Sequence, residues 1–88
     1  MTILERAIET YGKDMQLTVA VEEFSELIKE ICKNKRGENN IDHITEEVAD
    51  CYIMLAQVEL IFGIKTRDIN AMIDKKYTRL ADRLDGRR

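Results

Sequence analysis

The chain has 88 residues, of which 44% are hydrophobic and 35% are charged, with four Gly and no Pro. This composition is too apolar for a disordered segment and the length allows only one domain, so we predict a single all-α domain over residues 1–88. The net charge of −3 divides into −7 on residues 1–64 and +4 on residues 65–88, where eight Lys and Arg stand against four Asp. Few aromatic residues and no recognition motif argue against nucleic-acid binding.

A short first helix is predicted over residues 3–10. Thr2 and Glu5 have the spacing of a capping box, in which each side chain accepts a hydrogen bond from the backbone of the other residue. Gly12 follows closely and is a residue type that commonly ends helices. A helix this short is expected to pack as an arm against longer ones.

A long second helix is predicted over residues 15–34, with Asp14 as its N-cap. Its apolar side chains recur at the i, i+3, i+4 spacing of one helix face. This stripe consists of Leu17, Ala20, Val21, Phe24, Leu27, Ile28 and Ile31. The polar segment 33–40 contains Gly37 and interrupts the periodicity, so a surface loop is expected there.

Two further helices are predicted in the second half of the chain, one over residues 42–62 with Asp42 as its N-cap and one from Thr66 onwards. The apolar surface of the third helix is wide enough to need more than one packing partner. Helices 15–34 and 42–62 each have about 20 residues, or ~30 Å, and their short connection makes an antiparallel pair the natural arrangement.

Cys32 and Cys51 both fall within predicted helices, and no segment resembles a signal peptide or an apolar run of membrane-spanning length. We therefore expect no membrane association and a cytoplasmic location, where a reducing environment keeps both thiols free.

Two acidic clusters interrupt the apolar repeats of the two long helices. Each contains two acids three residues apart, Glu23 with Glu26 and Glu47 with Asp50. That spacing places like charges on one helix face, one turn apart, where they repel. A bound cation would relieve the repulsion, and ligand sets made only of oxygen suit hard ions, so Mg²⁺ is the predicted cofactor, with Mn²⁺ as the alternative.

This pattern resembles the EExxE…ExxD motif of the MazG-like all-α nucleoside triphosphate pyrophosphohydrolases. It reads Glu22-Glu23-x-x-Glu26, then twenty residues, then Glu47-x-x-Asp50, and the resemblance covers residues 17–83. It implies a four-helix MazG-like bundle with two central antiparallel helices, completed by oligomerisation into a homodimer or homotetramer. It also implies Mg²⁺-dependent hydrolysis of a nucleoside or deoxynucleoside triphosphate, including non-standard ones, to the monophosphate and pyrophosphate.

The resemblance also implies roles for individual residues. Glu23, Glu26, Glu47 and Asp50 would be the metal ligands, and Glu23 and Glu47 would also be catalytic. Glu22 would be a catalytic carboxylate that orients water without holding the ion.

Three basic residues on the fourth helix, Lys76, Arg79 and Arg83, match the basic side chains with which the family binds its substrate. They lie on one ridge of the predicted helix and could reach phosphate. A solvated helix face is the alternative interpretation of this basic end.

A dimerisation or nucleotide-binding module without catalysis is the alternative function, because broad apolar faces are explained by association alone. A ferritin-like di-iron site needs Glu-x-x-His pairs, and the residue three positions before His43 is Asn40. His43 is predicted to lie at the surface, and Glu30 and Glu46 are predicted to be solvated and outside the metal site.

Overall fold

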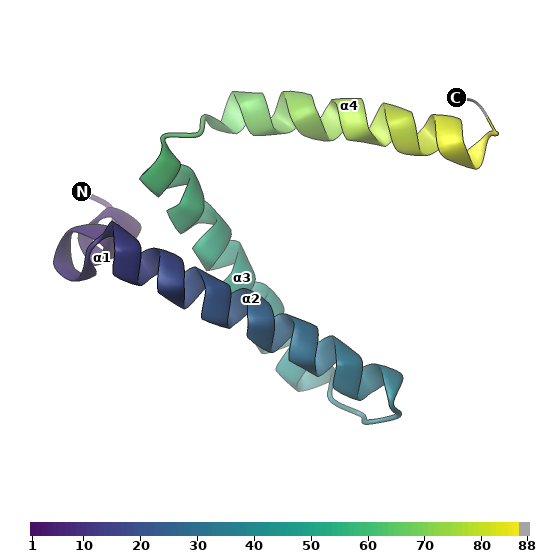
Figure 1. The fold of residues 1–88 in the computed structure, drawn as a ribbon, viewed down its shortest axis with the longest axis horizontal. Coiled ribbons are helices and arrows are strands. Elements are labelled where there is room, and N and C mark those ends of the chain that lie inside the picture. The colour runs from purple at the N-terminus through teal and green to yellow at the C-terminus, as the bar shows by residue number, and fades with distance from the viewer. Residues whose placement is uncertain (87–88) are drawn as a thin grey trace.

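The computed structural model describes residues 1–86, and within that range the chain is helical with no strand (Figure 1). The four helices are α1 (Ile3–Tyr11), α2 (Lys13–Lys35), α3 (Ile41–Phe62) and α4 (Thr66–Leu84). The predicted all-α class is confirmed, and each predicted helix lies within three residues of its expected bounds.

Helix α1 lies across one end of the α2–α3 pair and contacts both helices (Figure 1). The predicted capping box is present, because the Thr2 hydroxyl accepts from the Glu5 backbone N–H and the Glu5 carboxylate accepts from the Thr2 N–H. The helix ends at Gly12, which has a φ of 90°. Glycine adopts this backbone conformation without strain, whereas residues with a side chain rarely do.

Helix α2 begins two residues earlier than predicted, and Asp14 is not its N-cap. Only Gly12 separates α1 from α2, so the chain turns at that glycine and resumes helical geometry at Lys13. Asp14 therefore lies in the first turn of α2, where a carboxylate still interacts favourably with the positive end of the helix dipole.

Helices α2 and α3 run antiparallel and form the main packed unit, as predicted (Figure 1). Their shared core is small: among the described residues the buried hydrophobic side chains are Ala20, Cys51 and Met54. Of the predicted α2 stripe, Leu17, Ala20, Phe24 and Leu27 are buried or half-buried, whereas Val21, Ile28 and Ile31 are exposed. One face of α2 thus packs on α3 while part of its apolar surface remains uncovered.

The predicted loop is confirmed between Lys35 and Ile41, but Asp42 is not the N-cap of α3. Asn40 occupies the capping position, and its backbone carbonyl accepts from the Ile44 N–H. Asn40 is also buried within an otherwise polar, exposed loop. The start of α3 is therefore determined by a contact with another part of the fold.

Helix α4 lies apart from the other three helices (Figure 1), and none of its described residues is buried. A single chain consequently does not close the predicted four-helix bundle. The large apolar side chains that α4 leaves exposed are Met72, Ile73, Tyr77, Leu80 and Leu84. Helix α3 adds Tyr52, Ile53, Leu55, Leu60 and Phe62 to the uncovered apolar surface.

The dimensions of the molecule reflect this open arrangement. Its radius of gyration is 16.4 Å, whereas about 12 Å is expected for a compact domain of this length. Its accessible surface is 7184 Å², roughly 1,800 Å² more than the ~5,400 Å² expected for a folded monomer of this mass. None of the described helices is both long and apolar enough to cross a membrane.

Candidate metal centre

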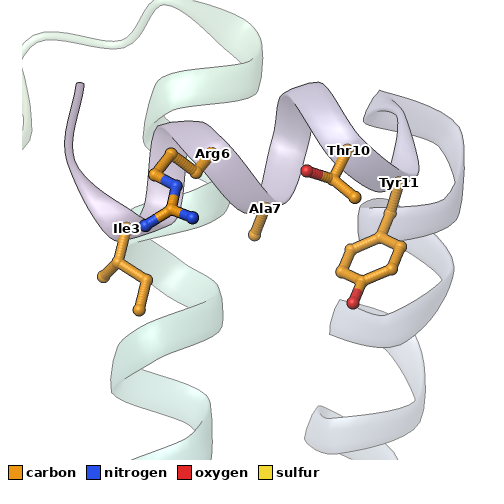
Figure 2. Close-up of a pocket in the computed structure, with 5 residues that line it drawn as sticks. All are labelled: Ile3, Arg6, Ala7, Thr10 and Tyr11. Atoms are coloured by element: carbon orange, nitrogen blue, oxygen red, sulfur yellow. The ribbon is translucent and has the colours of Figure 1, made fainter.

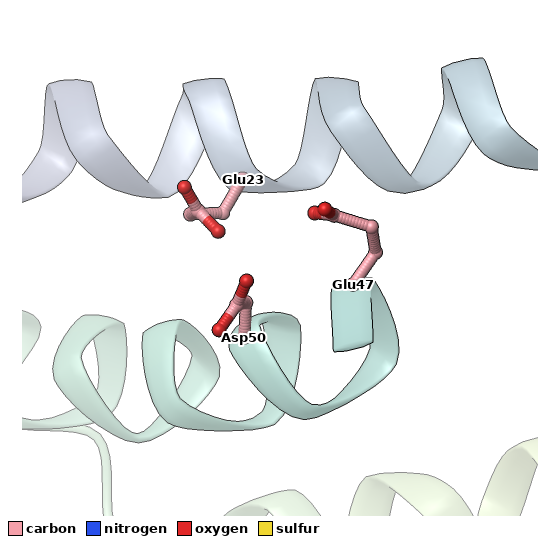
Figure 3. A group of neighbouring side chains, drawn as sticks. All are labelled: Glu23, Glu47 and Asp50. Carbon is pink, nitrogen blue, oxygen red and sulfur yellow. The ribbon is translucent and has the colours of Figure 1, made fainter. Parts of the chain in front are cut away.

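Three of the predicted metal ligands meet between the two long helices. Glu23 projects from α2 toward α3, and Glu47 and Asp50 project from α3 toward α2 (Figure 3). Each of the three offers a carboxylate oxygen, and these oxygens lie within 4.8 Å of one another. We refer to Glu23, Glu47 and Asp50 as the acidic triad.

The convergence follows from two levels of structure. The three-residue spacing puts Glu47 and Asp50 on one side of α3, one turn apart. Antiparallel packing then places that side against the middle of α2, where Glu23 lies (Figure 3). The thiol of Cys51, the residue after Asp50, is 3.6 Å from the Glu23 backbone carbonyl and can donate to it, so the two helices touch beside the triad.

The carboxylates of the triad are half-buried, and the negative charge of each one disfavours ionisation of the others. Burial raises the pKa of Glu23, and its hydrogen bond with Asp50 and the negative charges of Asp50 and Glu47 raise it further. The pKa of Glu47 is also raised, first by burial and then by the charge of Asp50. Burial and the same three carboxylates raise the pKa of the Cys51 thiol.

One oxygen of the triad has no protein partner. Glu47 Oε2 is buried and makes no hydrogen bond with a described residue. Buried polar atoms are normally satisfied, and an unpaired carboxylate oxygen beside two further carboxylates could bind a cation. The donor set consists only of carboxylate oxygen, which is the chemistry that Mg²⁺, Mn²⁺ and Ca²⁺ prefer.

The other two acids of the motif are outside the triad. Glu26 and Glu22 are both exposed on α2. The charge of Glu26 nevertheless contributes to the raised pKa values of Glu23 and Glu47, so this carboxylate lies close enough to act on the triad electrostatically.

The three predicted substrate-binding residues are not brought to the triad within one chain. Lys76, Arg79 and Arg83 are exposed on α4, which does not pack on α2 or α3 (Figure 1). No ion pair joins them to the triad among the described residues.

The prediction that Glu30 is solvated is wrong. Its side chain is only 8% exposed and is paired with Lys33 and His43 near the loop between α2 and α3. The burial follows from the loop folding back over the end of α2, which helical periodicity alone does not reveal. His43 and Glu46 are exposed, as predicted.

A concave surface of the described residues lies elsewhere, on α1. It is a shallow, open hollow (Figure 2) lined by Ile3, Arg6, Ala7, Thr10 and Tyr11. All five residues belong to α1, and none is a member of the acidic triad. This hollow therefore does not form part of the candidate metal centre.

No protein-family model matches this chain, and no curated protein or solved structure matches it. The resemblance to the MazG-like pyrophosphohydrolases therefore depends on the motif residues themselves.

Proposed function

We propose that this chain is a Mg²⁺-dependent nucleoside triphosphate pyrophosphohydrolase of the MazG-like type, with Mn²⁺ as an alternative ion. The observation that carries the proposal is the acidic triad: two helices supply three carboxylates to one point, and an unpaired Glu47 oxygen is among them. Mutually repelling carboxylates are an unfavourable feature of a helix interface unless a cation binds there.

The acidic side chains of the motif would have two roles, binding the ion and orienting water. Glu23, Glu47 and Asp50 would hold the ion, and Glu26, exposed one turn along α2, is the remaining candidate ligand. Glu22 would orient the attacking water from the exposed side of α2. The bound ion would neutralise charge on the triphosphate oxygens, which favours displacement of pyrophosphate.

The substrate-binding basic residues require a second copy of the chain in this proposal. The roughly 1,800 Å² of surface in excess of a monomer's lies within the ~1,000–2,500 Å² that each partner buries in an obligate dimer. A copy that covered the apolar side chains of α4 would complete the helical bundle as a homodimer or homotetramer. It would also give Lys76, Arg79 and Arg83 a route to the triad of a neighbouring chain.

A helical dimerisation module without catalysis is the second candidate. It is favoured by the same uncovered surface, since the described residues of α3 and α4 expose eleven large apolar side chains, namely Ile41, Tyr52, Ile53, Leu55, Leu60, Phe62, Met72, Ile73, Tyr77, Leu80 and Leu84. This candidate assigns no role to the triad and requires no nucleotide. A reducing cytoplasm would suit either function, because both Cys32 and Cys51 are free thiols.

Pyrophosphate release from a panel of standard and modified nucleoside triphosphates, with Mg²⁺, with Mn²⁺ and with EDTA, separates the two candidates. We expect metal-dependent release that Glu47→Gln abolishes while the helical circular dichroism spectrum is retained. Glu46→Gln is the matched control, because it removes one exposed charge from the adjacent position. Unchanged turnover in Glu47→Gln, or no release from any nucleotide by folded wild-type protein, would contradict the enzymatic proposal.

A further inference from the structure

A second polar cluster lies where α2 ends and α3 begins. Its centre is Glu30, whose side chain is 8% exposed, and Asn40, whose residue is 7% exposed. Buried charged and amide side chains are uncommon, and they persist where their hydrogen bonds are satisfied. We call Glu30 and Asn40 the Glu30–Asn40 clamp.

The Asn40 side chain joins the two helices directly. Its Nδ2 group donates to the Glu30 backbone carbonyl at 2.9 Å and to Glu30 Oε1 at 3.2 Å. Its Oδ1 atom accepts from Asn34 Nδ2 at 3.2 Å. One amide thus contacts both the backbone and the carboxylate of α2 from the residue that immediately precedes α3.

This use of Asn40 is unusual for its position. Asn at an N-cap normally accepts a hydrogen bond from the first turn of its own helix, but Asn40 makes no such side-chain bond. Its side chain is directed to α2 instead. The stabilisation available from capping α3 is therefore replaced by a link between the helices.

The ammonium group of Lys33 and the imidazole of His43 complete the surroundings of the Glu30 carboxylate. Lys33 Nζ lies 3.2 Å from Oε2, and His43 Nδ1 lies 3.3 Å from Oε1. The Asn40 hydrogen bond, followed by Lys33 and His43, holds the pKa of Glu30 below its ordinary value. Glu30 is thus an ionised acceptor on which donors from α2, the loop and α3 converge.

We propose that the Glu30–Asn40 clamp sets the rotation of α3 on α2 and so positions Glu47 and Asp50 opposite Glu23. Glu47 follows Asn40 by seven residues, or about two helical turns, so the two side chains lie on the same face of α3. A shift of one residue at the start of α3 would rotate that helix by about 100° and carry Glu47 away from α2. The connecting loop has only five residues, 36–40, and Asn40 is its one buried member.

The clamp is separate from the triad, so its substitution changes no proposed ligand. The expected effect of the substitution on metal binding rests on the proposed function. The expected effect on the rotation of α3 does not. Two readouts therefore follow from one variant, Asn40→Ala, with the exposed neighbour Asn39→Ala as the matched control.

The first readout is the reactivity of Cys51 toward a thiol reagent in metal-free protein. Cys51 is buried against Glu23, and exposed Cys32 in the same chain is an internal standard. We expect Cys51 to react faster in Asn40→Ala than in Val58→Ala, a destabilised control on the other half of α3, at temperatures where the two variants are equally folded. If the clamp only added general stability, Cys51 would react at the same rate in these two variants.

The second readout is Mn²⁺ affinity, measured by the electron paramagnetic resonance of the free ion. Asn40→Ala is expected to weaken binding about 10-fold or more, the usual effect of losing a residue that orients metal ligands. Unchanged Cys51 protection in folded Asn40→Ala would overturn the clamp, as would Mn²⁺ affinity equal to that of wild type. If Asn40→Ala does not fold, Asn34→Ala is judged by the same criteria. This substitution removes the donor to Asn40 Oδ1 and to the Glu38 backbone carbonyl, and it leaves both hydrogen bonds from Asn40 to Glu30 in place. Absence of Mn²⁺ binding by wild type would contradict the proposed function, and the clamp would then be decided by Cys51 alone.

Discussion

Replacing Glu23 by Gln should have opposite effects on stability in the absence and presence of Mg²⁺. In metal-free protein at neutral pH the three carboxylates of the triad lie within 4.8 Å of one another. Two unit charges at that separation repel by about 1 kcal/mol in water and about 3.5 kcal/mol at an effective dielectric constant of 20. Because the triad is only half-buried, we take about 1 kcal/mol as the net repulsion between Glu23 and Asp50.

Glu23→Gln removes this repulsion and the unfavourable burial of the Glu23 charge. Metal-free Glu23→Gln should therefore be more stable than wild type by about 1 kcal/mol, which corresponds to a melting temperature about 4–8 °C higher for a domain of this size. Saturating Mg²⁺ should reverse the order. A site filled at 100 times its Kd stabilises the folded protein by about 2.7 kcal/mol, and the variant would forgo most of this gain.

Thermal unfolding followed by circular dichroism, with EDTA and with an Mg²⁺ series at one fixed protein concentration, measures both effects. Glu9→Gln, which removes an exposed charge on α1, is the matched control and should respond to Mg²⁺ as wild type does. The reasoning is refuted if metal-free Glu23→Gln melts below wild type, or if wild type and variant gain equally from Mg²⁺.

Three further predictions concern pH, assembly and the core. In metal-free protein the pKa values of Glu23 and Glu47 are raised, so the folded state binds more protons than the unfolded state. The free energy of unfolding should therefore fall as pH rises above the ordinary pKa of 4.5. Urea unfolding at a series of pH values should show this decline, and Mg²⁺ should reduce it. The lowered pKa of Glu30 acts in the opposite direction, and its contribution should be lost as pH falls below 4.5. Leu80→Glu, on the exposed apolar face of α4, should lower the mass measured by analytical ultracentrifugation, and an unchanged mass would show that α4 lies outside any interface. Met54→Ala, at a side chain that is 5% exposed, should lower the free energy of unfolding by about 2–5 kcal/mol, and a loss below 1 kcal/mol in chemical denaturation would mean that this core readily rearranges.

Local features of the chain determined what could be predicted from the sequence. Helix periodicity and the Thr2–Glu5 capping box depend on contacts within a few residues, so the four helices and the start of α1 follow directly from the order of residue types. The same local rule paired Glu47 with Asp50 on one face of α3. The antiparallel α2–α3 arrangement followed from two long helices and a short connection, because such helices can bury their apolar faces only by folding back on each other.

The tertiary structure alone decided how those faces are aligned. Whether a carboxylate reaches the triad depends on the rotation of each helix about its axis, which brings Glu23 to Glu47 and leaves Glu26 on the exposed side. Burial of Glu30 depends on a loop residue, Asn40, that bonds ten positions back along the chain. The separation of α4 from the other three helices likewise does not follow from its own helical pattern. A helical pattern specifies which side chains share a face, but the partner of that face is determined by packing between segments distant in sequence.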